Sequence, residues 1–397
     1  MTPESRILQD RRRFLGSTLG VAAGALWFAS CGSEVSESVT MLPDGMDPKN
    51  FIVHGPMTIE SKRSVLRDEI TPTDRVFVRG NLGFPDAAIL EDADAWSLEI
   101  DGVAKPGSMT LKDLKALGST TITAVLQCSG NGRFFFEHGP SGSAWGVGAA
   151  ANVQWTGIPV KRVLEAMGGA VEGARFLTGT GGEPIPAALN ERDLVVERSI
   201  PLEKGMEDAI LAWELNGAPV NISHGGPLRL VVPGFYGVNN VKYLKRLAAT
   251  ADESDAKIQV SKYRVRPIGE KGAADQPSMW AMNVKSWVDD PLGDKALKAG
   301  MVDVTGVAFC GESPIQSVEV STDGGTTWAP AEMVGTDMGP YAWRRFSYRW
   351  DAAPGQHVIA SRATSVDGKV QPEKRVENHR GYAHNGWSDP SITVKVS

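Results

Sequence analysis

The sequence predicts an α+β domain that is followed by an all-β sandwich. Between about residues 61 and 275, short strand-like runs alternate with one or two helical segments and many Gly and Pro turns. From about residue 276 onward, evenly spaced runs of alternating apolar and polar residues replace this mixture. The chain has 397 residues, 42% of them hydrophobic and 22% charged, so it is long enough to bury a core in each of two domains.

Periodicity and turn residues locate the elements of the first domain. In chain order, we expect a helix at 111–117, a strand at 121–126, a helix at 160–166 and a strand at 228–232. Gly168 and Gly169 follow the second helix, as is common at helix C-termini. The last strand is an apolar run between Pro227 and Pro233, which predicts that it is buried.

The second domain is predicted from its regular spacing of strands. The expected strands are 302–307, 315–321, 343–350, 357–364 and 392–396. Between the second and third of them, Asp323-Gly324-Gly325 supplies a hairpin turn, since Gly tolerates the positive φ that such turns require. This pattern is typical of an immunoglobulin-like sandwich, a scaffold that by itself says nothing about chemistry.

The most informative local feature is a single thiol at the end of a predicted strand. Cys128 follows the strand at 121–126, and Gly130 and Gly132 then let the backbone turn sharply and come close to a bulky group. A Cys in this position is either a metal ligand on a loop or a buried structural residue, because free Cys is among the most buried residue types.

The segment Cys128-Ser129-Gly130-Asn131-Gly132-Arg133 resembles the Cys-Ser/Ala-Gly-Asn-X-Arg motif of the sulfite oxidase family of molybdopterin enzymes, whose Cys binds molybdenum. Further segments resemble family landmarks in the same order, from about residue 60 to the end: Phe77-Val78-Arg79, Trp155-Thr156-Gly157, 224–229, 231–237, 241–244, 321–328 and 378–387. The resemblance implies a molybdopterin-binding catalytic domain over residues 61–275 and an immunoglobulin-like dimerisation domain over residues 276–397.

The resemblance also implies a molybdenum-molybdopterin cofactor and a set of site residues. Cys128 is the implied molybdenum ligand, and soft thiolate sulfur suits a metal that the two sulfurs of a pterin dithiolene already hold. The implied cofactor-binding residues are Asn81, Cys128, Asn131, His224, Arg229 and Lys242, and the implied catalytic residues are Arg79, Arg133, Tyr263 and Arg380. Arg suits an oxyanion substrate because its planar fork donates two parallel hydrogen bonds.

Simpler interpretations of these residues stay open. Any single Arg can belong to a surface or interdomain salt bridge, and Tyr263 can be a half-buried packing residue. A solitary His is often structural, and His224 stands out only through the Gly-Gly-Pro-Leu-Arg that follows it.

Some positions differ from the vertebrate-type pattern of the family. Gly80-Asn81 stands where Asn-His follows the first Arg, and Asn239-Asn240 stands where a basic pair precedes Lys242. Gly234-Phe235-Tyr236-Gly237 instead looks like the bacterial branch, which includes sulfane dehydrogenase subunits and haem-free sulfite dehydrogenases.

Several functions are compatible with these features. The leading hypothesis is oxidation of sulfite to sulfate by oxygen-atom transfer, with electrons passed to a c-type cytochrome. The alternatives are a sulfane dehydrogenase subunit that acts on carrier-bound sulfur, a protein-repair reductase and a non-catalytic pterin-binding protein.

The N-terminal residues predict export. Arg11-Arg12-Arg13-Phe14-Leu15 precedes an apolar run, 19–29, that is too short to span a bilayer, which indicates a twin-arginine signal over residues 1–31. Residues 28–32 approximate a lipoprotein processing site, so both lipidation of Cys31 and ordinary cleavage nearby stay open. We expect a linker over residues 32–60 and a periplasmic protein, membrane-anchored if Cys31 is lipidated.

Charge and cysteine content restrict the partners. The net charge is −6 and would be about −8 without the signal, which argues against nucleic acid and is compatible with docking a basic redox partner. Three cysteines are too few for a disulfide framework, although a Cys128 to Cys310 disulfide stays an alternative. The chain has no Cys-X-X-Cys-His, so we expect no covalent c-type haem, and residues 33–60 are too few for an N-terminal b-type haem domain. We therefore expect a separate protein as electron acceptor.

Overall fold

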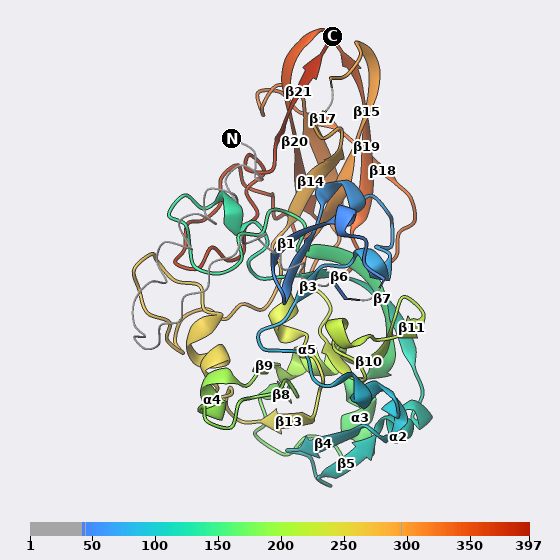
Figure 1. The fold of residues 1–397 in the computed structure, drawn as a ribbon, viewed down its shortest axis with the longest axis vertical. Coiled ribbons are helices and arrows are strands. Elements are labelled where there is room, and N and C mark those ends of the chain that lie inside the picture. Colours follow the sequence, from blue (N-terminus) through green and yellow to red (C-terminus); the bar gives the residue numbers. More distant parts are fainter. Residues whose placement is uncertain (1–41, 44, 295) are drawn as a thin grey trace, which may run out of the picture.

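The computed structural model describes residues 42–43, 45–294 and 296–397, so the predicted export signal and Cys31 lie outside the described residues. Two sheet-rich bodies follow one another along the long axis of the molecule, and the C-terminus lies at the far tip of the second body (Figure 1). Within the described residues, the α-helices are short: α2 (Leu111–Ala116), α3 (Val160–Ala166), α4 (Glu191–Leu194) and α5 (Leu202–Glu207). In the described ranges, none of the helices could cross a membrane.

Two five-stranded sheets form the core of the first body. The first contains β11 (Ala218–Pro219), β10 (Ile210–Leu215), β7 (Ala150–Pro159) and β6 (Thr120–Gln127) in spatial order, with β12 (Arg229–Val231) beside β10. The second contains β5 (Gly107–Thr110), β4 (Ser97–Asp101), β13 (Arg246–Thr250), β8 (Phe176–Thr180) and β9 (Glu197–Pro201). The predicted strands at 121–126 and 228–232 correspond to β6 and β12.

Both predicted helices of the first body are present and bury one face. α2 begins with a capping box, in which the Thr110 hydroxyl accepts from the Asp113 amide and the Asp113 carboxylate accepts from the Thr110 amide. Leu111 and Leu114 of α2 pack into the same apolar core as Val163 of α3. The two helices therefore cover the second sheet through apolar side chains spaced at the helical period.

A three-stranded sheet of β1 (Phe51–Gly55), β2 (Thr58–Ser61) and β3 (Val78–Arg79) corrects the predicted linker over 32–60. Phe51 and Ile59 are buried in a small apolar cluster with Val78. The polar composition of the whole stretch concealed these few apolar side chains, which are enough to attach residues 51–61 to the body. β3 is held in this sheet by pairing with β2, and it carries Arg79.

The second body contains two four-stranded antiparallel sheets. One has the order β14 (Lys285–Asp290), β15 (Gly300–Phe309), β19 (Arg344–Ala352) and β18 (Glu332–Val334). The other has the order β17 (Ala329–Pro330), β16 (Ile315–Ser321), β20 (Gly355–Ser365) and β21 (Ile392–Val396). All five predicted strands are present, and the Asp323-Gly324-Gly325 turn has φ of +73° and +93° at its two glycines.

The two bodies share an apolar core. Val125 and Tyr236 of the first body pack with Trp287, Phe309 and Trp343 of the second. The backbone also crosses the boundary, because the amide of Val125 donates to the carbonyl of Tyr341 at 2.8 Å. The first sheet and the second body are thus fixed relative to one another.

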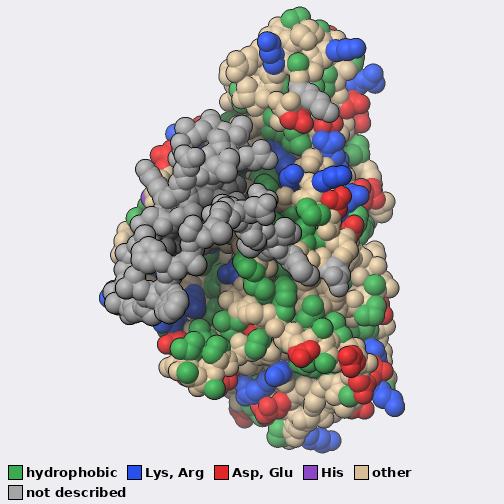
Figure 2. All heavy atoms as spheres, viewed as in Figure 1, with side chains coloured by type: hydrophobic (Ala, Val, Ile, Leu, Met, Phe, Trp, Pro, Cys, Tyr) green, Lys and Arg blue, Asp and Glu red, His purple; other side chains and the backbone are tan. Residues whose placement is uncertain are grey.

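Cys128 and Cys310 are both free, so the alternative of a disulfide between them is not realised. Cys310 is buried in the core of the second body. On the face in Figure 2, Lys and Arg side chains are intermixed with Asp and Glu toward both ends of the molecule.

Candidate cofactor site

The turn after β6 fixes Cys128 through the main chain. The Cys128 amide donates to the Ala149 carbonyl, and the Asn131 amide donates to the Cys128 carbonyl, each at 2.9 Å. The Asn131 side chain adds two bonds, because its Nδ2 donates to Gln127 at 3.0 Å and its Oδ1 accepts from the Ala149 amide at 3.1 Å. Asn131 therefore braces the turn, and the half-buried thiol of Cys128 faces a cavity.

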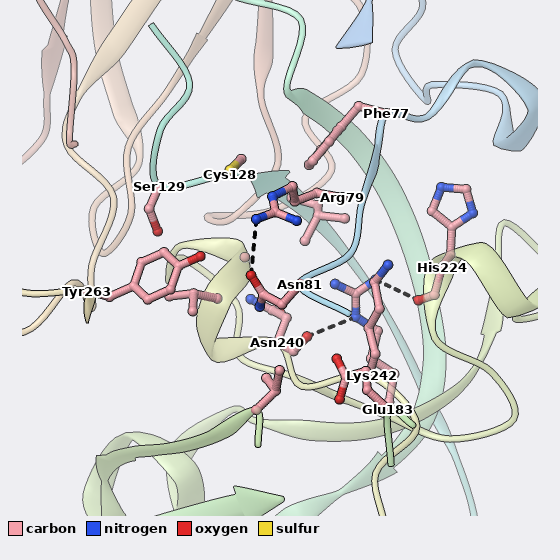
Figure 3. A pocket seen from close by; sticks show the side chains of 15 residues that line it. Phe77, Arg79, Asn81, Cys128, Ser129, Glu183, His224, Asn240, Lys242 and Tyr263 are labelled. Carbon is pink, nitrogen blue, oxygen red and sulfur yellow. Dashed lines mark hydrogen bonds between the residues drawn. The ribbon is translucent and has the colours of Figure 1, made fainter. Parts of the chain in front are cut away.

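Most of the predicted site residues line this single cavity, shown in Figure 3. They are Arg79, Asn81, Cys128, His224, Arg229, Lys242 and Tyr263. Cys128 lies near Arg79, while Lys242 and Glu183 lie toward the opposite end of the cavity (Figure 3). The sequence brings these residues together from β3 and the residues after it, the end of β6, the turn before β12, β12 itself, the loop after β12 and the segment after β13 that contains Tyr263.

Arg79 carries the cation nearest to the thiol in this view of the cavity. Its Nη2 donates to the Oδ1 of Asn81 at 3.1 Å, which orients the guanidinium without neutralising it. Within the described residues, Arg79 forms no ion pair with a carboxylate. Its charge is therefore available to an anion near Cys128.

Arg229 and Lys242 place two buried cations at the other end. Arg229 donates to the carbonyls of Asn240 and His224, at 3.2 and 2.7 Å, and Lys242 donates to the carbonyl of Ser223 at 2.6 Å. Burial, followed by the charge of Arg229, lowers the pKa of Lys242 to about 7, and burial lowers the pKa of Arg229 to about 10. Two desolvated cations held by neutral carbonyls favour an anionic ligand such as a phosphate.

His224 is buried and neutral. Burial, with Lys242 and Arg229 nearby, lowers the pKa of its imidazole to about 3. Its Nδ1 lies 2.8 Å from the Oδ1 of Asn221, whereas its Nε2 has no hydrogen-bond partner within the described part of the chain. A buried ring nitrogen without a partner can accept or donate a hydrogen bond to a ligand.

Glu183 is a cavity residue that the sequence analysis missed. Burial raises the pKa of its carboxyl to about 7, and its Oε2 lacks a hydrogen-bond partner among the described residues. Gly181 and Gly182 precede it directly after β8. A strand followed by two glycines is the same signal that drew attention to Cys128, and it would have identified Glu183 as well.

Tyr263 enters the cavity after a short π-helical turn, Ile258–Lys262, a local irregularity that is frequent at functional sites. Its ring stacks on that of Tyr382 with centroids 5.3 Å apart and an interplanar angle of 13°. Burial raises the pKa of its hydroxyl to about 12, so the phenol stays protonated and can donate. Tyr263 therefore both packs against Tyr382 and lines the cavity.

Arg133 and Arg380 do not line the cavity. The guanidinium of Arg133 is buried and donates to the carbonyls of Arg380 and Ser143, both at 2.8 Å. Arg380 lines a neighbouring cleft, and its Nη1 donates to the hydroxyl of Ser141 at 2.6 Å. The predicted roles of these two arginines in substrate binding stay predictions.

The two glycines of the Cys128 turn approach side chains of the protein itself. At Gly130, an added Cβ would overlap the guanidinium of Arg133, and at Gly132 it would overlap the imidazole of His384. Gly132 also has a φ of +99°, a left-handed conformation that glycine adopts readily. The bulky groups that the sequence pattern indicated are therefore these two side chains.

Asn239 and Asn240, which stand where the vertebrate-type pattern has a basic pair, form hydrogen bonds within the protein. The Oδ1 of Asn239 accepts from buried Arg198 at 3.3 and 3.2 Å, and the Oδ1 of Asn240 accepts from the Val232 amide at 2.9 Å. Asn81, at the other departure, lines the cavity and orients Arg79.

The donor set fits a metal-pterin group. One free thiol, two buried cations, His224 and Glu183 line one cavity, and the Nε2 of His224 and the Oε2 of Glu183 have no hydrogen-bond partner among the described residues. Across the described ranges, no group of three or more His, Cys, Asp or Glu side chains could hold a metal by itself. A metal bound by Cys128 would therefore take further ligands from the cofactor.

Comparisons with known proteins agree with this site. The model of the oxidoreductase molybdopterin-binding domain matches residues 85–258, and the model of the Mo-co oxidoreductase dimerisation domain matches residues 276–395. Mitochondrial sulfite oxidases from Homo sapiens and Drosophila melanogaster are 30% and 29% identical over 82% and 86% of this chain. The chain spans 62% of the length of each of these two relatives.

A solved structure resembles nearly the whole chain. The sulfane dehydrogenase SoxCD from Paracoccus pantotrophus superimposes with a TM-score of 0.71 and 27% identity, over 94% of this chain and 96% of that chain. The fold and the cavity are those of a molybdopterin-binding domain that is followed by a Mo-co oxidoreductase dimerisation domain. The chain belongs to the sulfite oxidase family, and the predicted molybdenum-molybdopterin cofactor is confirmed at the level of the family.

Proposed function

We propose that this protein oxidises sulfite to sulfate and passes the electrons to a c-type cytochrome. The observation that carries the proposal is the cavity in which the free thiol of Cys128 lies near the guanidinium of Arg79, which forms no ion pair within the described residues. A thiol at a metal and a cation for an oxyanion are what such a reaction needs from the protein. The sulfite oxidases among the relatives support the choice of substrate.

The cofactor, when bound, supplies oxygen-atom transfer and accepts two electrons. Cys128 would hold its molybdenum, and the buried cations of Arg229 and Lys242 would hold its phosphate. His224 and Glu183 would contact the pterin through the atoms that have no partner in the described residues.

The chain's own residues bind and orient the substrate. Arg79 donates to the oxyanion, and Asn81 keeps its guanidinium in place. The hydroxyl of Tyr263 stays protonated at neutral pH and donates a further hydrogen bond within the cavity. In this proposal, the protein supplies position and electrostatics for chemistry that belongs to the cofactor.

A second candidate function is oxidation of sulfur attached to a carrier protein. Two observations favour it: the likeness to a sulfane dehydrogenase structure over nearly the full length, and the bacterial-type Gly234-Phe235-Tyr236-Gly237 segment. Such a substrate would need to present its sulfur at the mouth of the same cavity. The two functions differ in the substrate and share the residues that hold the cofactor.

Assembly and location belong to the same proposal. We infer a homodimer that forms through an immunoglobulin-like second body, supported by the family model of a dimerisation domain over residues 276–395. The twin-arginine segment supports export to the periplasm, where the protein would be anchored if Cys31 is lipidated.

Steady-state kinetics test the proposed substrate. Purified, molybdenum-loaded protein is assayed with cytochrome c as acceptor, first with sulfite and then with thiosulfate plus a sulfur carrier protein. We expect turnover with sulfite alone, and loss of that turnover in Cys128→Ser. Turnover only in the presence of the carrier would favour the second function, and equal activity of Cys128→Ser would remove the site from the reaction.

A further inference from the structure

Residues of the second body close the back of the Cys128 turn. The amide of Ala383 donates to the carbonyl of Ser129 at 3.0 Å, and the Nζ of Lys285 donates to the carbonyl of Asn131 at 3.2 Å. The ring of His384 fills the space that a side chain at Gly132 would need. The turn is therefore held on one side by β7 and on the other by a different folded body.

Lys285 is the unusual member of this set. It lies on β14 with 1% of its surface exposed, and the described residues offer its Nζ no carboxylate within ion-pair distance. Asp389 attracts the charge from farther away, but its carboxylate accepts from His384 and Arg375, at 2.8 and 2.7 Å. Burial consequently lowers the pKa of Lys285 to about 7.

A buried cation without a carboxylate partner lowers the stability of a fold, and apolar replacements of buried charges are often neutral or stabilising. Stability therefore does not explain Lys285. What the residue does supply is a hydrogen bond to a buried carbonyl, and this bond is stronger when the amine is protonated. Its acceptor, the Asn131 carbonyl, belongs to the residue whose amide closes the turn on Cys128.

We propose that Lys285 is a positioning residue for Cys128, acting through the carbonyl of Asn131. The inference rests on the proposed role of Cys128 as the metal ligand. The bond from Lys285 to the Asn131 carbonyl and the bond from the Asn131 amide to the Cys128 carbonyl hold the same short segment, so the thiol keeps one orientation relative to the cavity. Displacement of a reacting group by about 1 Å can reduce turnover by roughly a hundredfold.

Hydrogen exchange of the molybdenum-loaded, full-length protein measures the rigidity of the turn directly. In Lys285→Met, we expect exchange of residues 128–136 to become roughly tenfold faster, the order of magnitude for loss of a bond from a charged donor. Lys285→Gln keeps a neutral donor and should fall between Lys285→Met and the wild type. The free energy of unfolding should stay unchanged or rise in Lys285→Met, because a buried charge is removed.

Lys204→Met is the matched control. Lys204 is also a buried lysine, but it is paired with Asp208 at 2.7 Å and lies over the rings of Phe235 and Tyr341, and none of its described contacts is with residues 128–136. Its replacement should reduce the free energy of unfolding and leave exchange of residues 128–136 unchanged. Unchanged exchange of these residues in Lys285→Met, or an equal rise there and in β4, would overturn the proposal.

Kinetics provide a second readout. Lys285→Met should reduce kcat per molybdenum and leave the KM for sulfite unchanged, because Arg79 lies in the cavity and does not contact Lys285. A raised KM with unchanged kcat would contradict a positioning role. If the wild type itself does not oxidise sulfite, the proposed function fails, while the exchange experiment still decides the role of Lys285.

Discussion

Arg79 combines three properties at the scale of single residues: it lines the cavity, it is oriented by Asn81, and it has no carboxylate partner within the described residues. These properties distinguish it from Arg133, whose donors are bound by main-chain carbonyls. An Arg contact to a charged oxyanion typically contributes about 1.5–3 kcal/mol. Arg79 is therefore the residue at which substrate affinity should be most sensitive.

Arg79→Gln should raise the KM for sulfite by roughly one to two decades, with molybdenum content unchanged. High salt should partly reproduce the effect by screening the anion. Arg380→Gln is the matched comparison, since its guanidinium lies in a neighbouring cleft, and it should raise KM less. Kinetics normalised to molybdenum content test whether Arg79 binds the substrate. An unaltered KM in Arg79→Gln would show that this arginine has only a structural role.

The lowered pKa of Lys242 predicts how the stability of the cofactor-free protein depends on pH. Its folded-state pKa of about 7 lies below the usual 10.5, so between these values the unfolded state binds more protons. Lys242 alone should therefore make the free energy of unfolding rise with pH from about 7 to 10.5, by at most about 1.4 kcal/mol per pH unit. A bound phosphate would restore the charged form and remove this rise.

Urea unfolding at several pH values checks the prediction for Lys242. The wild type without cofactor should gain stability across this pH range. Lys242→Met should lose the part that Lys242 contributes, while Lys285, whose pKa is also lowered to about 7, contributes another part. The loaded protein should show the flatter profile of the mutant. Identical pH slopes for wild type and Lys242→Met would mean that Lys242 is charged in the fold and already paired.

The sequence predicted which residues belong to the cavity better than it predicted their orientation. Cys128, His224 and Lys242 carry signals that are local in the chain, such as a strand end or a glycine turn. The directions of the Arg133 and Arg380 side chains depend on carbonyl and hydroxyl partners that are distant in sequence. Glu183 belongs to none of the family motifs, and its only signal in the sequence is the pair of glycines that precedes it.

At the scale of elements, strands with strict alternation and helices with clear ends were predicted to within a few residues. The strand 315–321 matches β16, and the helix 160–166 matches α3. The prediction of a linker was wrong for residues 51–61, because the burial of two apolar side chains, Phe51 and Ile59, determines the structure of this otherwise polar stretch. The average composition of a segment does not reveal single apolar residues, whereas the free energy gained on burial depends on each side chain.

The glycine turn after β6 provides a prediction at this scale. Gly132→Ala combines a positive φ with overlap of the His384 ring, whereas Gly217→Ala combines a φ of +78° with open space. The control should therefore show only the cost of the left-handed conformation, about 1–2 kcal/mol. Gly132→Ala should reduce the free energy of unfolding by more than that and also lower molybdenum content.

Chemical denaturation of both glycine variants, with metal analysis, separates the two contributions. Equal losses of stability in Gly132→Ala and Gly217→Ala would show that His384 moves aside without cost. Full molybdenum content in Gly132→Ala would show that the turn tolerates the shift and still delivers Cys128 to its position.

At the scale of the whole molecule, the predicted boundary near residue 276 separates two sheet-rich bodies that do not behave as separate units in their packing. Trp287 and Trp343 of the second body are each about 1% exposed and pack against Val125 of the first. The indole Nε1 of Trp343 also donates to the carbonyl of Glu69 at 3.0 Å. Sequence patterns locate each body, but this contact surface follows from tertiary packing.

The shared core predicts that both bodies unfold together. Unfolding either one alone would expose large apolar side chains of the other, and a buried aromatic side chain contributes about 3–5 kcal/mol when truncated to Ala. Calorimetry of the full chain should therefore show one transition, with agreement between calorimetric and van't Hoff enthalpies. Trp343→Ala should lower the transition temperature for probes in both bodies equally, whereas two resolved transitions in the wild type would contradict the coupling.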